Sequence, residues 1–163
     1  MRRALLPMFL GLSLCAAPVA LANTSHAGWP YIDGALVMHK LDESWPIYAP
    51  FPNLHNELLG GHGNDTIYAG NAGDVIWGDY KPSGQPTTQN DVLQGGAGRD
   101  FIYASHGHNA IDTGAGNDVV HAHFGYGSIT CHSPQTVVFI SHRSRKGYTL
   151  QGCRRISYKT LGY

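Results

Sequence analysis

Two nine-residue stretches decide the fold: Gly-Gly-His-Gly-Asn-Asp-Thr-Ile-Tyr at residues 60–68 and Gly-Gly-Ala-Gly-Arg-Asp-Phe-Ile-Tyr at residues 95–103. Both match the pattern G-G-x-G-x-D-x-U-x, in which U is a large aliphatic residue. The same frame extends from them in both directions, and its eighth place always holds an aliphatic residue: Leu58, Ile67, Ile76, Leu93, Ile102, Ile111, Val120, Ile129 and Val138. One buried aliphatic side chain in every unit predicts a stack of short strands.

This pattern resembles the repeats-in-toxin (RTX) family of calcium-binding parallel β-rolls, most clearly between Leu58 and Val120. The resemblance implies an all-β fold, a parallel β-roll or β-solenoid, with Ca²⁺ as the cofactor of the fold. It also implies metal ligands at the sixth place of the units, which holds Asn56, Asp65, Asp74, Asp91, Asp100, Asn109 and Asp118. The sixth place then changes to Gly127 and Thr136, where we expect metal binding to end.

Two units should make one coil, so each sixth-place residue should lie beside the residue two units later. We define the first edge as Asn56, Asp74, Asp100 and Asp118, and the second edge as Asp65, Asp91 and Asn109. Stacked carboxylates repel one another unless a cation lies between them, and Ca²⁺ takes six to eight oxygen ligands. We therefore expect calcium between Asp74 and Asp100, between Asp100 and Asp118, and between Asp65 and Asp91.

The N-terminus has the three parts of an export signal, which we assign to residues 1–22. Arg2 and Arg3 precede an apolar stretch, and Ala20-Leu21-Ala22 is a small-residue cleavage site. This predicts a secreted, extracellular chain that starts near Asn23 and has no membrane span. A lipoprotein anchored at Cys15 is the alternative, but Leu14 is larger than the residue that usually precedes such a cysteine.

The remaining chain divides into a repeat region and two ends. We expect an N-terminal cap at residues 23–50, the roll at 51–139 with an insertion at 80–89, and a basic C-terminal cap at 140–163. Asp79, just before the insertion, either joins a ligand set or caps the insertion. An exported chain with two remaining cysteines predicts a disulfide between Cys131 and Cys153; free thiols, or a metal site with His132, are the alternative. This arrangement resembles small secreted bacterial calcium-binding proteins.

Aromatic side chains flank the buried aliphatic residues along one side of the roll. Trp77, Phe101, Tyr103 and His121 form a candidate binding face for a glycan, envelope or protein partner, unless the N-terminal segment or the insertion covers them. The chain has 11 basic and 11 acidic residues, and this balance gives no reason to expect nucleic acid.

Other residues suggest chemistry more weakly. His106 with His108 and His121 with His123 could chelate a transition metal, although turn histidines are the simpler interpretation. Ser105, His106 and Asp112 are the residue types of a hydrolytic triad, but no G-x-S-x-G motif accompanies them. We therefore expect a non-enzymatic secreted protein that needs calcium to fold and serves adhesion, envelope or matrix interaction. The alternative is a calcium-stabilised secreted hydrolase or sugar-modifying enzyme.

Overall fold

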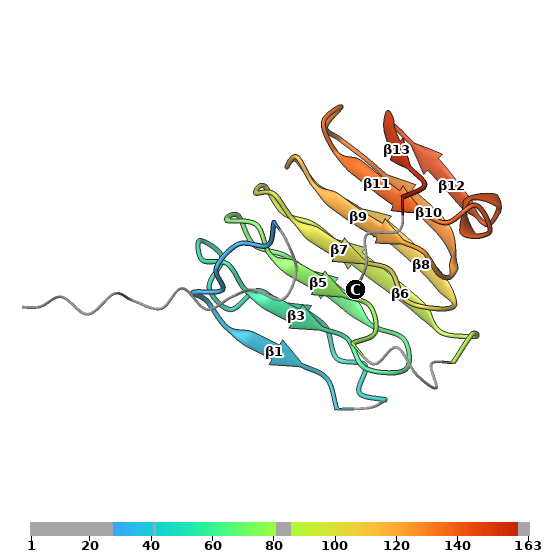
Figure 1. Cartoon of the computed structure of the whole chain (residues 1–163). Helices are drawn as coiled ribbons and strands as arrows, with labels where there is room; N and C mark the ends of the chain where they lie inside the picture. Colours follow the sequence, from blue (N-terminus) through green and yellow to red (C-terminus); the bar gives the residue numbers. More distant parts are fainter. Residues whose placement is uncertain (1–27, 41, 81–85, 160–163) are drawn as a thin grey trace, which may run out of the picture.

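The chain folds as an all-β parallel β-solenoid of about six turns (Figure 1). The structure, a computed structural model, describes residues 28–40, 42–80 and 86–159. The expected export signal and Cys15 lie outside these residues. Within the part of the chain described, no helix is both long enough and apolar enough to cross a membrane.

Two parallel sheets form opposite walls of the solenoid, and successive strands alternate between them. In the described residues the seven-stranded sheet contains, in order, β1 (Leu36–Met38), β3 (Glu57–Leu59), β5 (Val75–Trp77), β7 (Phe101–Tyr103), β9 (Val119–Ala122), β11 (Val137–Ile140) and β13 (Arg155–Ser157). The six-stranded sheet contains, in order, β2 (Ile47–Tyr48), β4 (Thr66–Tyr68), β6 (Asn90–Gln94), β8 (His108–Asp112), β10 (Tyr126–Thr130) and β12 (Tyr148–Gln151). A short 3-10 helix, η1 (Ser144–Lys146), precedes β12.

The register of the strands confirms two units per coil. Leu58 pairs with Ile76, Ile76 with Ile102, and Ile102 with Val120. All nine aliphatic residues of the eighth place are at most 2% exposed, so they make a single stacked core. The insertion lies between β5 and β6 in the sequence, and the aliphatic residues of the strands on either side of it stay in register.

The N-terminal segment contributes more than a cap. Its β1 pairs with β3 and its β2 pairs with β4, so this segment builds a first coil that has no glycine-aspartate repeat. Val37 lies opposite Leu58 and Ile47 opposite Ile67, which extends the aliphatic stack. Inward packing of these apolar side chains therefore determines the coil even where the turn sequence differs.

The aromatic side of the seven-stranded sheet is covered. Trp77 stacks on Tyr103, and Tyr103 on His121, with ring centroids 4.0 and 4.5 Å apart. Trp29 packs edge-on against this ladder, and its Nε1 donates a hydrogen bond to the hydroxyl of Tyr103 at 2.7 Å. Phe101, Tyr103 and His121 are 4%, 5% and 8% exposed. Of the two alternatives for Trp77, Phe101, Tyr103 and His121, an open binding face or a covered one, the contacts favour cover: Trp29 of the N-terminal segment packs on Trp77 and Tyr103, and Tyr103 stacks on His121.

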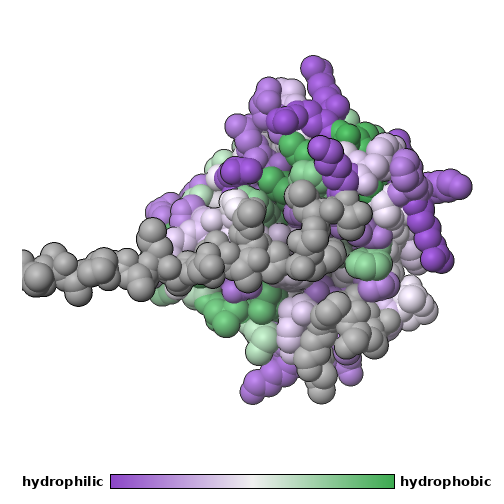
Figure 2. Space-filling view, in the orientation of Figure 1, coloured by the Kyte–Doolittle hydropathy of each residue, from purple (hydrophilic) through white to green (hydrophobic). Residues whose placement is uncertain are grey.

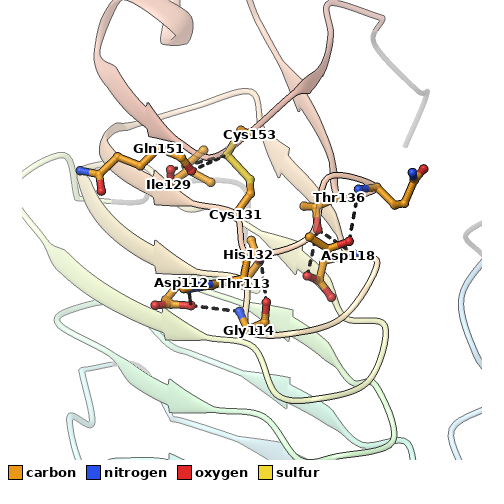
Figure 3. The surroundings of a disulfide bond; sticks show 12 residues. Asp112, Thr113, Gly114, Asp118, Ile129, Cys131, His132, Thr136, Gln151 and Cys153 are labelled. Carbon is orange, nitrogen blue, oxygen red and sulfur yellow. Dashed lines mark hydrogen bonds and ion pairs between the residues drawn. A yellow bond between two sulfur atoms is a disulfide. The ribbon is translucent and has the colours of Figure 1, made fainter.

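The C-terminal coil is closed by the expected disulfide between Cys131 and Cys153 (Figure 3). Its strand β12 pairs with β10 and β13 pairs with β11, so the tail forms a last full coil. Figure 2 shows hydrophilic side chains gathered over the end of the molecule where Figure 1 places β12 and β13. Exposed basic residues there are Arg143, Lys146, Arg154, Arg155 and Lys159.

Candidate calcium sites

Along the first edge, each turn is bonded to the next through its sixth-place side chain. The amide of Asn56 donates to Oδ1 of Asp74 at 2.6 Å, and the amide of Asp74 donates to Oδ1 of Asp100 at 2.6 Å. The amide of Asp100 donates to Oδ1 of Asp118 at 3.0 Å. All four side chains are fully buried. The structure therefore stacks the first-edge residues in the order that the sequence predicts.

The second carboxylate oxygen on this edge bonds within its own turn. Oδ2 of Asp74 accepts from the amide of Gly70 at 2.6 Å, and Oδ2 of Asp100 accepts from the amide of Gly96 at 2.7 Å. Burial nevertheless raises the pKa of Asp100 to about 7, and the charges of Asp118 and Asp74 add to this rise. Burial likewise raises the pKa of Asp118. Amide donors alone do not compensate for these buried charges.

The second edge holds the same kind of ladder. The amide of Asp65 donates to Oδ1 of Asp91 at 2.9 Å. Ser105 donates a short hydrogen bond to Oδ2 of Asp91 and contacts Oδ1 of Asn109 at 2.8 Å. Burial raises the pKa of Asp91 to about 6 and also raises that of Asp65. Asp65, Asp91 and Asn109 are thus brought together as the repeat predicts.

Asp79 also belongs to this edge, although it is not a sixth-place residue. It is 5% exposed, and the Gln89 side-chain amide donates a short hydrogen bond to its Oδ2. Its Oδ1, like Oδ2 of Asp65, is buried and has no hydrogen-bond partner. Burial raises the pKa of Asp79 to about 7, and the charge of Asp91 contributes next. The sequence could place Asp79 only beside the insertion, because the broken frame hides its register.

Both ladders end in residues that are neutral or that donate to the ladder. Asn56 Nδ2 donates to the carbonyls of Phe51 and Leu54, and Asn109 Nδ2 donates to those of Ser105 and Gly107.

At the other end of each aspartate ladder, a further side chain contacts the last carboxylate. The Thr136 hydroxyl accepts from the amide of Asp118 and contacts Oδ2 of Asp118, both at 3.2 Å (Figure 3). His39 makes a short contact through Nδ1 with Oδ1 of Asp65. Asp118 and Asp65 therefore each have a side-chain partner that is not a carboxylate.

Glycine leaves the room that these ladders need. A Cβ at Gly60 would lie 1.8 Å from the carbonyl oxygen of Gly78 and 2.8 Å from Oδ2 of Asp65. A Cβ at Gly116 would lie 1.7 Å from the carbonyl oxygen of Gly98 and 2.4 Å from Oδ1 of Asp118. Coils can approach this closely only because these positions lack a side chain.

Comparison with known proteins identifies the repeat. The profile of the RTX calcium-binding nonapeptide repeat, in four copies, matches residues 53–79 and 87–120. These are RTX calcium-binding repeats forming a β-solenoid. The gap between the two matched segments falls within the insertion. No curated protein and no solved structure matches the chain.

The RTX repeats fit a calcium ion. The interior turns supply hard oxygen donors, which Ca²⁺ prefers: buried carboxylates of both edges and the nearby backbone carbonyls. Two carboxylate oxygens, on Asp65 and Asp79, are buried without any donor. Among the described residues, no group of three or more His, Cys, Asp or Glu side chains is arranged to hold a metal by itself. A calcium ion held by these RTX turns would take backbone carbonyl oxygens as well as aspartate oxygens.

The other candidate residues of the RTX chain have different surroundings. The Ser105 hydroxyl bonds to Asp91 and Asn109, the His106 ring stacks on Phe124, and Asp112 pairs with His132 at 2.9 Å. Ser105, His106 and Asp112 thus each contact different residues. His108 packs against Tyr126, while the His121 and His123 ring centroids lie 6.0 Å apart.

Proposed function

We propose that this RTX repeat protein is exported, that calcium completes its fold outside the cell, and that the folded solenoid serves adhesion, envelope or matrix interaction. The observation that carries the calcium-dependent part is the stack of buried aspartates inside both edges. Asp74, Asp100 and Asp118 are 0% exposed on one edge, as is Asp65 on the other.

Calcium dependence follows from the electrostatics of these stacks. A buried carboxylate is costly unless it is paired or bound to a metal. Here the raised pKa values of Asp79, Asp91 and Asp100 show that burial opposes their ionised forms. Outside the cell calcium is plentiful, so the cation that relieves this repulsion is available there.

The C-terminal coil supports a role in contacting an envelope or matrix. Arg143, Lys146, Arg154, Arg155 and Lys159 are exposed on or beside it, and no acidic residue follows Asp118 in the sequence. A single-sign cluster of this kind attracts anionic surfaces at low ionic strength. The disulfide and the strands β12 and β13 hold the basic side chains on a folded frame.

Circular dichroism during calcium titration tests the calcium-dependent part of the proposal. The purified mature chain should gain β structure as calcium is added and lose it after chelation. A spectrum that already shows full β structure in chelator, and that calcium leaves unchanged, contradicts the proposal. Salt-dependent retention on vesicles of anionic phospholipid, compared with vesicles of neutral phospholipid, then tests the surface role.

One observation favours the enzymatic alternative. A cleft of about 510 Å³ is lined by His106, His123, Tyr126 and Arg143, together with Phe124 and Ser144. Histidine and arginine beside an aromatic wall could bind a sugar and transfer a proton. Screening the calcium-loaded chain for glycoside and ester hydrolysis distinguishes the two functions. Turnover that His106→Ala abolishes supports the enzyme, and a lack of turnover supports the binding role.

A further inference from the structure

Two buried side chains on the second edge, Asp79 and Gln89, lie at the two ends of the insertion and contact each other. Asp79 follows β5, and Gln89 immediately precedes β6. The Gln89 amide donates to Oδ2 of Asp79 and also to the carbonyl of His106 at 3.0 Å. Asp79 and Gln89 are 5% and 3% exposed. The two ends of the insertion therefore meet inside the solenoid, against the next coil.

Asp79 occupies the second place of its unit, where Gly61 stands in the preceding coil and Ser105 in the next coil. At this place a side chain lies beside the sixth-place ladder, as Ser105 shows by bonding to Asp91. The Gln89 side chain that bonds Asp79 also accepts a hydrogen bond at 3.4 Å from the amide of Gly63, two residues before Asp65. Three carboxylates therefore share one short stretch of the second edge.

Both ends of that stretch are already closed by donors. His39 contacts Oδ1 of Asp65 at one end, and at the other end the Ser105 hydroxyl bonds to Oδ2 of Asp91. Between them, Oδ2 of Asp65 and Oδ1 of Asp79 remain buried without a hydrogen-bond donor. Two unpartnered anionic oxygens between closed ends are the environment in which a hard cation is expected.

We propose that Asp79 is a calcium ligand outside the repeat pattern, which adds a third carboxylate to the site of Asp65 and Asp91 and couples the insertion to that site. This inference rests on the proposed calcium-dependent function. Backbone carbonyls complete the coordination, since these side chains alone do not make a metal cluster. Gln89 is a positioning residue that holds Oδ2 of Asp79 and leaves its Oδ1 for the ion.

Asp79→Asn tests the proposal by isothermal titration of the chelator-treated full chain with calcium chloride. The variant keeps the size of the side chain and an oxygen for Gln89, but removes the charge. We expect the affinity of one class of site to fall about tenfold or more, because ligand charge tunes calcium affinity. Asp112→Asn is the matched control, since Asp112 is half-exposed and lies outside both edges. It should bind calcium as the original chain does.

Thermal unfolding separates a ligand from a simple cap. As a ligand, Asp79 repels Asp65 and Asp91 without calcium, so Asp79→Asn should raise the Tm in chelator and reduce the rise in Tm that calcium produces. Gln89→Ala, which keeps the carboxylate, should bind calcium within about threefold of the original affinity. Equal losses in Asp79→Asn and Gln89→Ala would overturn the proposal, as would an Asp79→Asn chain that does not fold.

The failure of this inference differs from failure of the proposed function. If the original chain shows no response to calcium, the proposed function fails. If the original chain responds and Asp79→Asn binds calcium with the same affinity and number of sites, only the assignment of Asp79 fails.

Discussion

The backbone amide of Asp74 donates a hydrogen bond to Oδ1 of Asp100 at 2.6 Å, although 26 residues separate them in the sequence. The equivalent bond from Asp100 to Asp118 spans 18 residues. The insertion accounts for the difference between the two separations. One carboxylate therefore joins neighbouring coils by a hydrogen bond, and in the proposed function it also binds calcium.

Asp100→Ala should lower the free energy of unfolding in saturating calcium by about 2–4 kcal/mol, because it leaves one buried and one partly buried amide donor without acceptors. These donors are the amides of Asp74 and Gly96. Urea denaturation in calcium measures the change. Asp112→Ala, at a half-exposed carboxylate, should change it by no more than about 0.5 kcal/mol. Equal effects of the two substitutions would show that the hydrogen bonds along the first edge do not stabilise the fold.

The calcium-free protein should lose stability as the pH rises from about 4 to about 7. The pKa values of Asp79 and Asp100 are raised to about 7 and that of Asp91 to about 6, above the value of 3.8 for a free aspartate. Between these limits the folded state binds more protons than the unfolded state, so deprotonation favours unfolding. The Tm in metal-free buffer should therefore be higher at pH 5 than at pH 7.5, and calcium should reduce the difference. A Tm that rises with pH without calcium contradicts this assignment.

Replacing Cys131 and Cys153 together by serine should destabilise the C-terminal coil by about 3 kcal/mol, the chain-entropy value for a loop of this length. The bridge spans 22 residues and encloses β11 and β12. Hydrogen exchange should show faster exchange in β12 and β13, with little change in β5 and β7. Uniformly faster exchange in all coils would mean that the bridge supports the whole solenoid.

Trp29→Ala should destabilise the protein by about 2 kcal/mol, because it removes a half-buried ring and its hydrogen bond to Tyr103. It should also expose the ladder of Trp77 and Tyr103, which increased binding of a hydrophobic dye would report. Tyr31→Ala is the control in the same segment, since Tyr31 is 59% exposed. Unchanged stability and dye binding in Trp29→Ala would show that the segment does not seal this side.

Much of the repeat region could be predicted because each nine-residue unit contains both the residue that it buries and the residue that lines its turn. The eighth-place aliphatic residue and the sixth-place aspartate recur at a fixed spacing, so the coil, the core and both edges follow from local sequence. The sequence predicts only a cap at residues 23–50, whereas the structure forms a coil there. Val37 and Ile47 extend the aliphatic core in this coil without glycine-aspartate turns. A single buried aliphatic residue is harder to recognise in a sequence than a glycine-aspartate turn motif.

Sequence by itself determines the period of this protein, the residues of its core and the order of the aspartates along each edge, since these depend on contacts between equivalent places. Only the tertiary structure decides where non-repeating residues fall. It places Trp29 against Tyr103, His39 against Asp65, and Asp79 against Gln89. These positions depend on how the N-terminal segment and the insertion fold back on the solenoid, and no periodic pattern records the path of such segments.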